Sequence, residues 1–409
     1  MSVTARVPAL QPFRIRSFRF QWPADLLASW AFEMEGIILG WFVLISTGSV
    51  LLLALFGSLQ FLGTLISPLY GMAGDRIGNR ALLCLMRGTY LLVALVLMAL
   101  FLTGNATPVA VFALSTIIGL VRPSDITMRN LLVGETMPAE LLMRAMGISR
   151  TTADSARVVG ALSGAGLVAA LGSGWAYAAV CVVYAVSFAL TFNVGTARLR
   201  VLSEGAAAGS SVLRMLKEGF AYVGEHEAIK MVLILALAPL ILAQPYTSLL
   251  PVFAKDVLDI GSQGLGILFA APGVGAVLGA VVVATFSHME GRGKFLLGGA
   301  AAFGLSILGL AFSPTLWMAL PLLAVSGFAN TSYNALANSF LQMAAPPNMR
   351  GRVVSIYLLN RGLAPLGTLM AGALATWFDT RIALALMGGS CALLVAYIAV
   401  AARTVREIE

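Results

Sequence analysis

The sequence contains few charged residues. Asp, Glu, Lys and Arg make up 11% of its 409 residues, against about 25% in an average soluble domain. Hydrophobic residues make up 59%, compared with roughly 45–50% in such domains. A chain of this composition cannot cover a water-soluble domain with polar groups, but it is long enough for many membrane spans of about 20 residues each. We therefore expect an integral membrane protein without a large aqueous domain.

Cysteine and histidine are also scarce. The three cysteines, Cys84, Cys181 and Cys391, all lie in hydrophobic runs, so no disulfide framework is expected. The two histidines, His226 and His288, form no cluster of metal ligands with other residues. The sequence also lacks the GxxxxGKS/T loop that binds phosphates. These absences argue against an enzyme and against an ATP-driven pump, and we expect neither a cofactor nor a metal.

Hydrophobic runs recur along the whole chain at lengths that suit membrane-spanning helices. Arginines precede the first run, but no signal-peptide cleavage site follows them, so we expect this run to remain as a membrane helix. The twelve predicted spans are residues 24–46, 48–72, 81–103, 108–130, 146–171, 174–195, 229–253, 262–286, 295–313, 315–341, 353–377 and 382–402.

Basic residues are distributed unevenly between the two ends of these spans. With the N-terminus in the cytosol, 19 of the 26 Lys and Arg lie at cytoplasmic ends, five lie within spans, and only Lys255 and Arg381 lie outside. Cytoplasmic loops of membrane proteins are enriched in Lys and Arg. Both termini are therefore predicted to be cytoplasmic. The net charge of +8 reflects this topology and does not indicate nucleic-acid binding.

The longest predicted connection, residues 196–228, divides the spans six and six. Leu213, Leu216 and Phe220 recur at helical spacing behind Ser211, which predicts an amphipathic surface helix in this linker. The predicted organisation is a cytoplasmic segment 1–22, a first bundle 23–195, the linker 196–228, a second bundle 229–403 and a cytoplasmic tail 404–409.

The two bundles carry traces of an internal duplication. An offset of 204 residues relates Arg157 to Arg361. The pairs related by an offset of 208 residues are Gly119 with Gly327, Ser124 with Ser332, Asn130 with Asn338, and Pro138 with Pro346. Transporters built from repeats hold their substrate near the bilayer midplane, at the interface of the repeats. We therefore expect an all-α membrane protein with twelve transmembrane helices in two pseudo-symmetric six-helix bundles.

A loop motif follows the second predicted span. Residues 71–80 read GMAGDRIGNR, in which Gly71 is expected to permit close helix approach and Gly78 a tight turn. The pattern GxxxDRxGxR between the second and third of twelve spans resembles the loop signature of the major facilitator superfamily. The resemblance covers the whole chain and is greatest to the branch that contains the enterobactin exporter and drug efflux proteins. It implies a multi-pass transporter of the bacterial cytoplasmic membrane that works by alternating access.

The resemblance also implies that this motif is a latch, which holds the two halves together on the cytoplasmic side. A second copy of the motif has lost the acid, because His288 stands at the position of Asp75. Only the first copy is therefore expected to act as an electrostatic latch. Its residues are Gly71, Asp75, Arg76, Gly78 and Arg80.

Ionisable residues inside membrane spans are costly and are expected to face the protein interior. In the first span, Glu33 lies on a stripe of small residues, whereas Glu35 points to another face of the helix. Glu33 is the leading candidate for a proton-coupling carboxylate, and Asp125 and Glu35 are further candidates. The alternative is that these acids only neutralise buried arginines.

The fourth and fifth spans carry further charges. Arg122, Asp125 and Arg129 share one face of a helix, and Asp154 and Arg157 follow three residues apart. We assign Arg129, Asp154 and Arg157 to a structural charge network.

Two further arginines, Arg122 and Arg87, have different expected roles. The helix arrangement implied by the resemblance brings Arg122 and Glu33 together across the central cavity. Arg87, in the third span, is predicted to extend its side chain to the cytosolic interface.

The second bundle supplies mostly uncharged candidates for the substrate cavity. Amide and aromatic groups with few charges suit an amphiphilic organic molecule better than a sugar. Each of them also suits an interhelical hydrogen bond. Together with Arg122, the candidates are Gln244, Tyr246, Asn330, Tyr333, Asn334, Tyr357, Asn360 and Arg361.

These features predict a proton-coupled exporter, or antiporter, of an amphiphilic organic molecule such as a drug or a siderophore-like metabolite. The fifth span keeps only Gly160 and Gly164 of the family's antiporter motif, so the export direction depends on the overall resemblance. The alternatives are an importer or lysolipid transporter on the same fold, or a channel or sensor. The expected partners are the small-molecule substrate, protons and membrane lipids, without nucleic acid, and the chain is expected to act as a monomer.

Overall fold

The computed structural model describes residues 8–195, 212–285, 291–346, 349, 352–353, 356–357 and 359–401. Within these residues the chain forms helices and short connections, and no strand. Eight of the described helices are long and apolar enough to cross a membrane, judged by length and composition. The prediction of an all-α membrane protein is confirmed, whereas the cytoplasmic placement of the termini stays a prediction.

The chain folds as two compact units. Unit 1 comprises Met1–Arg200 with Ile260–Ala270, and unit 2 comprises Val201–Asp259 with Ala271–Glu409. The predicted bundles place Ile260–Ala270 with the second half, so the division into units differs from them at this segment.

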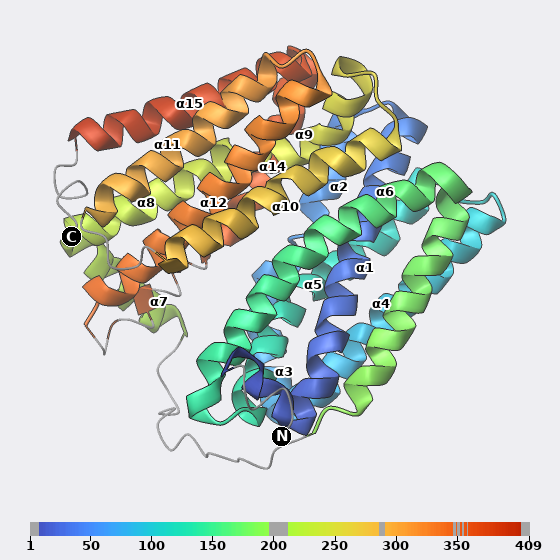
Figure 1. Ribbon diagram of the computed structural model, residues 1–409, viewed down its shortest axis with the longest axis horizontal. Helices are drawn as coiled ribbons and strands as arrows, with labels where there is room; N and C mark the ends of the chain where they lie inside the picture. The colour runs from blue at the N-terminus through green and yellow to red at the C-terminus, as the bar shows by residue number, and fades with distance from the viewer. Residues whose placement is uncertain are drawn as a thin grey trace. The chain divides into compact units, whose positions relative to one another are not determined.

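Unit 1 contains the first helices of the chain, drawn from blue to green in Figure 1. Helix α1 lies along α6 and contacts α5, while α4 contacts both α5 and α6. The elements are η2 (Pro8–Arg14), α1 (Arg16–Thr47), α2 (Val50–Leu59), α3 (Gly63–Ile77), α4 (Asn79–Leu102), α5 (Pro108–Thr136) and α6 (Ala139–Phe192).

Two boundaries in unit 1 differ from the prediction, and a third agrees with it. Helix α1 begins at Arg16, so part of the predicted cytoplasmic segment 1–22 is helical. The predicted span 48–72 is broken between α2 and α3. The spans predicted at 146–171 and 174–195 are two helices that meet at a kink at Gly172, and both carry the label α6. The bend requires glycine because φ is 77° there, a conformation that side chains with a Cβ rarely adopt.

Unit 2 contains the remaining helices, drawn from yellow-green to red in Figure 1, except for the first part of α10, which belongs to unit 1. Helix α11 contacts α8, α12 and α15, and α14 contacts α8, α9 and α15. The elements are α7 (Val212–Glu225), α8 (Glu227–Leu242), α9 (Tyr246–Val252), η3 (Phe253–Val257), α10 (Ser262–Thr285), α11 (Arg292–Ala311), α12 (Leu316–Ala344), η4 (Asn360–Leu363), α14 (Ala364–Trp377) and α15 (Thr380–Ala401).

The linker helix forms as predicted, as α7. Its Phe220 side chain is 52% exposed, and the side chains of Leu213 and Leu216 lie outside the described residues. Glu218 and Arg352 form an ion pair of 2.8 Å, which attaches α7 to the segment that follows α12.

Each unit uses a glycine at an equivalent position to pack two helices. A Cβ on Gly119 of α5 would overlap the carbonyl of Leu59 at the end of α2, and a Cβ on Gly327 of α12 would overlap the carbonyl of Pro272 in α10. These are the two glycines that the 208-residue offset relates. The same helix contact therefore occurs in both units, as the duplication predicts.

Candidate functional site

Three charged side chains meet in unit 1 with partial exposure. The Glu33 carboxylate of α1 lies 4.0 Å from Arg122 of α5 and 3.9 Å from Arg157 of α6. The side chains are 30% exposed for Glu33, 23% for Arg122 and 47% for Arg157. We call Glu33, Arg122 and Arg157 the accessible trio; its formal charge is +1 when Glu33 is ionised.

Arg122 has two further contacts that hold its side chain. Its guanidinium donates a hydrogen bond to the Gln60 side chain, beside the break between α2 and α3. It also lies 4.7 Å from the centre of the Phe32 ring, within the range of a cation–π contact. Arg122 is therefore positioned by neutral groups as well as by Glu33.

Glycine on α6 allows the approach that builds the trio. A Cβ on Gly160 would lie 2.6 Å from the Glu33 Cβ and 2.9 Å from the Trp30 carbonyl oxygen. Both distances are shorter than a Cβ atom makes to atoms to which it is not bonded. The Trp30 indole donates a 2.7 Å hydrogen bond to Ser163, one turn further along α6. Arg157 precedes Gly160 by one turn, so this close contact of α1 with α6 places Arg157 beside Glu33.

A second group of charges is buried nearby. Arg87 of α4 forms an ion pair with Asp25 of α1 and lies 3.9 Å from Asp125 of α5. Arg129 forms an ion pair with Asp125 and lies 3.8 Å from Asp25. Two arginines and two aspartates leave no net charge, and each is less than 9% exposed. We call Asp25, Arg87, Asp125 and Arg129 the buried quartet.

The prediction that Arg87 reaches the cytosolic interface is wrong. Arg87 is 1% exposed, and besides its acidic partners it donates a 2.5 Å hydrogen bond to Thr191. The reason is Asp25, which sequence reasoning missed and which supplies a counter-charge inside unit 1. Asp25 lies inside the first predicted span, 24–46, and a charge within a membrane span is the signal that would have found it.

The predicted ladder of Arg122, Asp125 and Arg129 is divided by the structure. Asp125 and Arg129 join the buried quartet, whereas Arg122 joins the accessible trio. Asp125 is 0% exposed and is surrounded by two arginines, which suits a structural counter-charge. The side chain of Asp154 lies outside the described residues.

Glu35 is separated from both groups, as its predicted orientation implies. It is 3% exposed and accepts hydrogen bonds of 2.6 Å from Tyr177 and 2.9 Å from Tyr184. Both tyrosines lie on the second half of α6, beyond the bend. Two buried hydroxyl donors therefore satisfy this carboxyl.

The latch motif lies at the junction of α3 and α4. Gly78 joins the helices with φ at 89°, as a tight turn requires. The expected close approach at Gly71 is wrong for the described part of unit 1, because no atom lies within 4 Å of a Cβ built there. Arg76 is exposed, and Arg80 donates a 2.6 Å hydrogen bond to the carbonyl of Phe192. The side chain of Asp75 lies outside the described residues.

Sequence reasoning missed a contact made by the residue before Arg80. Asn79 donates a 2.5 Å hydrogen bond to the carboxylate of Glu135, at the end of α5. This bond ties the start of α4 to α5 beside the latch motif. Its signal in the sequence is weak, because Glu135 lies 56 residues away and outside any span.

Four predicted cavity residues of unit 2 form a hydrogen-bonded chain. Asn330 donates to the Gln244 side chain at 2.9 Å, and Asn334 donates to the Asn330 side chain at 2.7 Å. The Tyr357 hydroxyl donates to Asn334 at 2.8 Å. The chain connects α12 with the residues that follow α8 and with those that precede η4. It contains no charged group.

The other four candidates in unit 2 either have different surroundings or have side chains outside the described residues. Tyr246 and Tyr333 are 3% and 2% exposed and both pack near Phe303 of α11, so we omit them from the proposed site. Asn360 lies in η4 with its amide nitrogen buried and without a hydrogen-bond partner among the described residues. Arg361 also lies in η4, and its side chain is outside the described residues.

Comparison with known proteins gives a match over almost the whole chain. A family model described as transmembrane secretion effector matches residues 7–409. The chain is 28% identical over 351 residues to the multidrug efflux pump Tap of Mycolicibacterium fortuitum, covering 82% of this chain and 83% of that protein. It is 21% identical over 352 residues to the staphyloferrin A transporter of Staphylococcus aureus (strain NCTC 8325 / PS 47), covering 86% and 87%.

Solved structures show the same fold at low sequence identity. The nucleoside transporter NupG superposes with a TM-score of 0.72 at 14% identity, over 93% of this chain and 98% of that one. The POT family transporter PepTSo superposes with a TM-score of 0.72 at 13% identity, over 96% and 99%.

Proposed function

Because the chain belongs to the transmembrane secretion effector family of the major facilitator superfamily, we propose that it is a proton-coupled exporter of an amphiphilic organic small molecule. It is a multi-pass membrane transporter and not an enzyme. The relatives named as a multidrug efflux pump and a staphyloferrin A transporter support an organic cargo. Rocking of the two halves, as the family resemblance implies, would expose the cargo site alternately to each side.

The observation that carries the proposal is the geometry of Glu33. Among the three coupling candidates, Asp125 and Glu35 are buried behind fixed partners, whereas Glu33 is 30% exposed in its side chain. Its ion-pair distances of 4.0 Å and 3.9 Å lie at the outer limit of such contacts. Glu33 can therefore exchange a proton without disruption of a buried network.

Protonation of Glu33 changes the charge of the accessible trio from +1 to +2. Arg122 and Arg157 then lose the negative charge of Glu33, which leaves more of their mutual repulsion unbalanced. If the two conformations of the transporter hold these arginines at different separations, protonation of Glu33 would favour the conformation in which they lie further apart. This is how a proton gradient would drive the cargo step.

The test uses purified protein in liposomes with an imposed pH gradient and radiolabelled chloramphenicol, a neutral amphiphile, as the cargo. We expect the gradient to accelerate chloramphenicol transport by the native protein. Glu33→Gln, which cannot ionise, should abolish that acceleration. The matched control is Glu140→Gln, at an exposed position in the first turn of α6. Native transport that ignores the gradient, or a Glu33→Gln variant that still responds to it, would refute the coupling.

A further inference from the structure

Helix α12 carries four amide side chains at intervals of four residues. They are Asn330, Asn334, Asn338 and Gln342, and this spacing places neighbours on the same face of a helix. Two of the steps are bridged by side-chain hydrogen bonds, from Asn334 to Asn330 at 2.7 Å and from Gln342 to Asn338 at 3.2 Å. We call these four residues the amide track.

The two ends of the amide track have different surroundings. Asn330 and Asn334 are tied to other helical segments through Gln244 and Tyr357. Asn338 and Gln342 form a side-chain hydrogen bond with each other and with no other described residue. Interhelical bonding thus explains the first pair but not the second.

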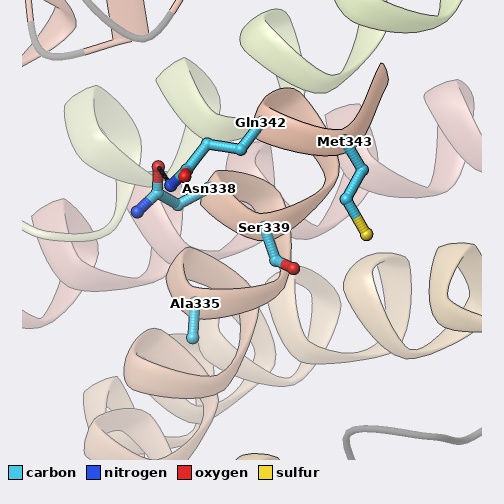
Figure 2. A pocket seen from close by; sticks show the side chains of 5 residues that line it. All are labelled: Ala335, Asn338, Ser339, Gln342 and Met343. Carbon is cyan, nitrogen blue, oxygen red and sulfur yellow. Dashed lines mark hydrogen bonds between the residues drawn. The ribbon is translucent and has the colours of Figure 1, made fainter. Parts of the chain in front are cut away.

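A hollow of about 430 Å³ opens over the second pair. Figure 2 shows the amides of Asn338 and Gln342 turned toward one another, with Ser339 and Met343 on the adjoining side of the same helix. The lining residues are Ala335, Asn338, Ser339, Gln342 and Met343. The hollow therefore combines amide and hydroxyl groups with apolar side chains at its edges.

Charge is nearly absent from the membrane part of unit 2. Within the predicted spans from 229 to 402, the charged residues are Lys230, at the start of the first of them, and Arg361. Near the outer ends lie Lys255, Asp256, Asp259, Asp379 and Arg381, and Arg292 and Lys294 lie at the start of α11. Helix α12 contains no Asp or Glu that could balance a permanent cation bound along the amide track, and an unbalanced charge is costly in a membrane site. Amides offer both donors and acceptors to neutral polar groups.

From this arrangement we propose that the α12 hollow is a loading site for uncharged amphiphiles that carry amide or hydroxyl groups. Asn338, Ser339 and Gln342 bind the polar groups, and Ala335 and Met343 contact the apolar part. Asn334 and Asn330 continue the track with groups of the same chemistry. The proposal rests on the proposed transport function and specifies the class of cargo.

The test compares two probes in the same proteoliposomes. Chloramphenicol is a neutral molecule with amide and hydroxyl groups, and tetraphenylphosphonium is a permanent cation without hydrogen-bonding groups. We expect the native protein to prefer chloramphenicol. The variant Asn338→Leu/Gln342→Leu should lose chloramphenicol transport by about tenfold, because one to two hydrogen bonds are removed. Met318→Leu, at an exposed position of α12 that does not line the hollow, should stay within about twofold.

Controls separate binding from folding and cargo class from coupling. Asn338→Gln in place of Asn338→Leu in the double variant should restore part of the lost chloramphenicol transport. The thermal unfolding midpoint should be the same for all variants. Preference for tetraphenylphosphonium, or full chloramphenicol transport by the double leucine variant, would overturn the loading site.

If either of these outcomes appears while transport still follows the pH gradient, the proposed exporter stands and the proposed loading site is rejected. If Asn338→Leu/Gln342→Leu abolishes a chloramphenicol flux that ignores the gradient, the track stands and proton coupling falls. Preferred transport of carboxyfluorescein that is lost in Arg361→Gln would also overturn the neutral cargo class.

Discussion

Individual charged residues of unit 1 differ in exposure, and this difference separates structural from exchangeable charges. The buried quartet is neutral, enclosed and joined by ion pairs, so each member depends on the others. The accessible trio has longer ion-pair distances and side chains between 23% and 47% exposed. Loss of a quartet residue should therefore weaken the fold, whereas loss of a trio residue should alter transport.

Arg87→Leu tests the structural role of the quartet. The substitution leaves Asp25 buried with less compensation, which is expected to lower the free energy of unfolding by about 3–5 kcal/mol. Thermal unfolding of the purified protein, followed by tryptophan fluorescence, measures the change. Arg76→Leu is the control, because it is the same substitution at an arginine whose side chain is exposed.

The double variant Asp25→Leu/Arg87→Leu tests whether the loss of stability comes from the unpaired aspartate. Removal of both charges leaves no unpaired aspartate, so part of the lost stability should return. An unfolding midpoint of Arg87→Leu equal to that of Arg76→Leu would show that the quartet is dispensable.

At the scale of the element, glycines decide which helices come close enough to build the sites. Gly160 brings α6 against α1 beside Glu33, and Gly119 and Gly327 join equivalent helices in the two units. Such contacts place backbone against backbone, where membrane helices gain most from packing.

Gly160→Ala tests whether this contact builds the accessible trio. The added methyl group would lie 2.6 Å from the Glu33 Cβ, so α6 must move away from α1. We expect a loss of about 1–3 kcal/mol in unfolding free energy, together with slower gradient-driven chloramphenicol transport as Arg157 withdraws from Glu33.

Gly166→Ala is the matched control on the same helix. No atom lies within 4 Å of a Cβ built at Gly166, so alanine there should leave transport unchanged and stability equal or higher. Native stability and transport in Gly160→Ala would show that the trio does not depend on the close contact.

At the scale of the whole molecule, the proposed transport cycle requires the two halves to alternate between conformations, and the loop motif after α3 is the proposed latch. Asp75→Asn removes the acid while it keeps the side-chain shape. We expect the variant to fold normally and to turn over more slowly, because one conformation loses an electrostatic contact. The measurement is the maximal rate of chloramphenicol transport in proteoliposomes, set beside the thermal unfolding midpoint.

The control for the latch is the same chemical change at another exposed acid. Asp259 has φ at 50°, a conformation that asparagine accepts, so Asp259→Asn should leave turnover unchanged. A maximal rate in Asp75→Asn equal to that of the native protein would reject the latch.

The sequence by itself determined the fold class, the number and place of the hydrophobic runs and the family. These follow from local properties, because a span needs a certain length of apolar residues and a loop motif is read directly. The partnership of Glu33 with Arg122 also followed, because the resemblance supplied the order of helices. Helical periodicity then told which residues share a face.

Only the tertiary structure decided which neighbour covers each face. Periodicity placed Arg122, Asp125 and Arg129 together, but the approach of α4 buried two of them and left Arg122 accessible. Likewise, the burial of Arg87 depends on Asp25, which lies 62 residues earlier in the chain. The pattern within one helix carries no information on the counter-charge that a distant helix brings, so these outcomes required the packed helices.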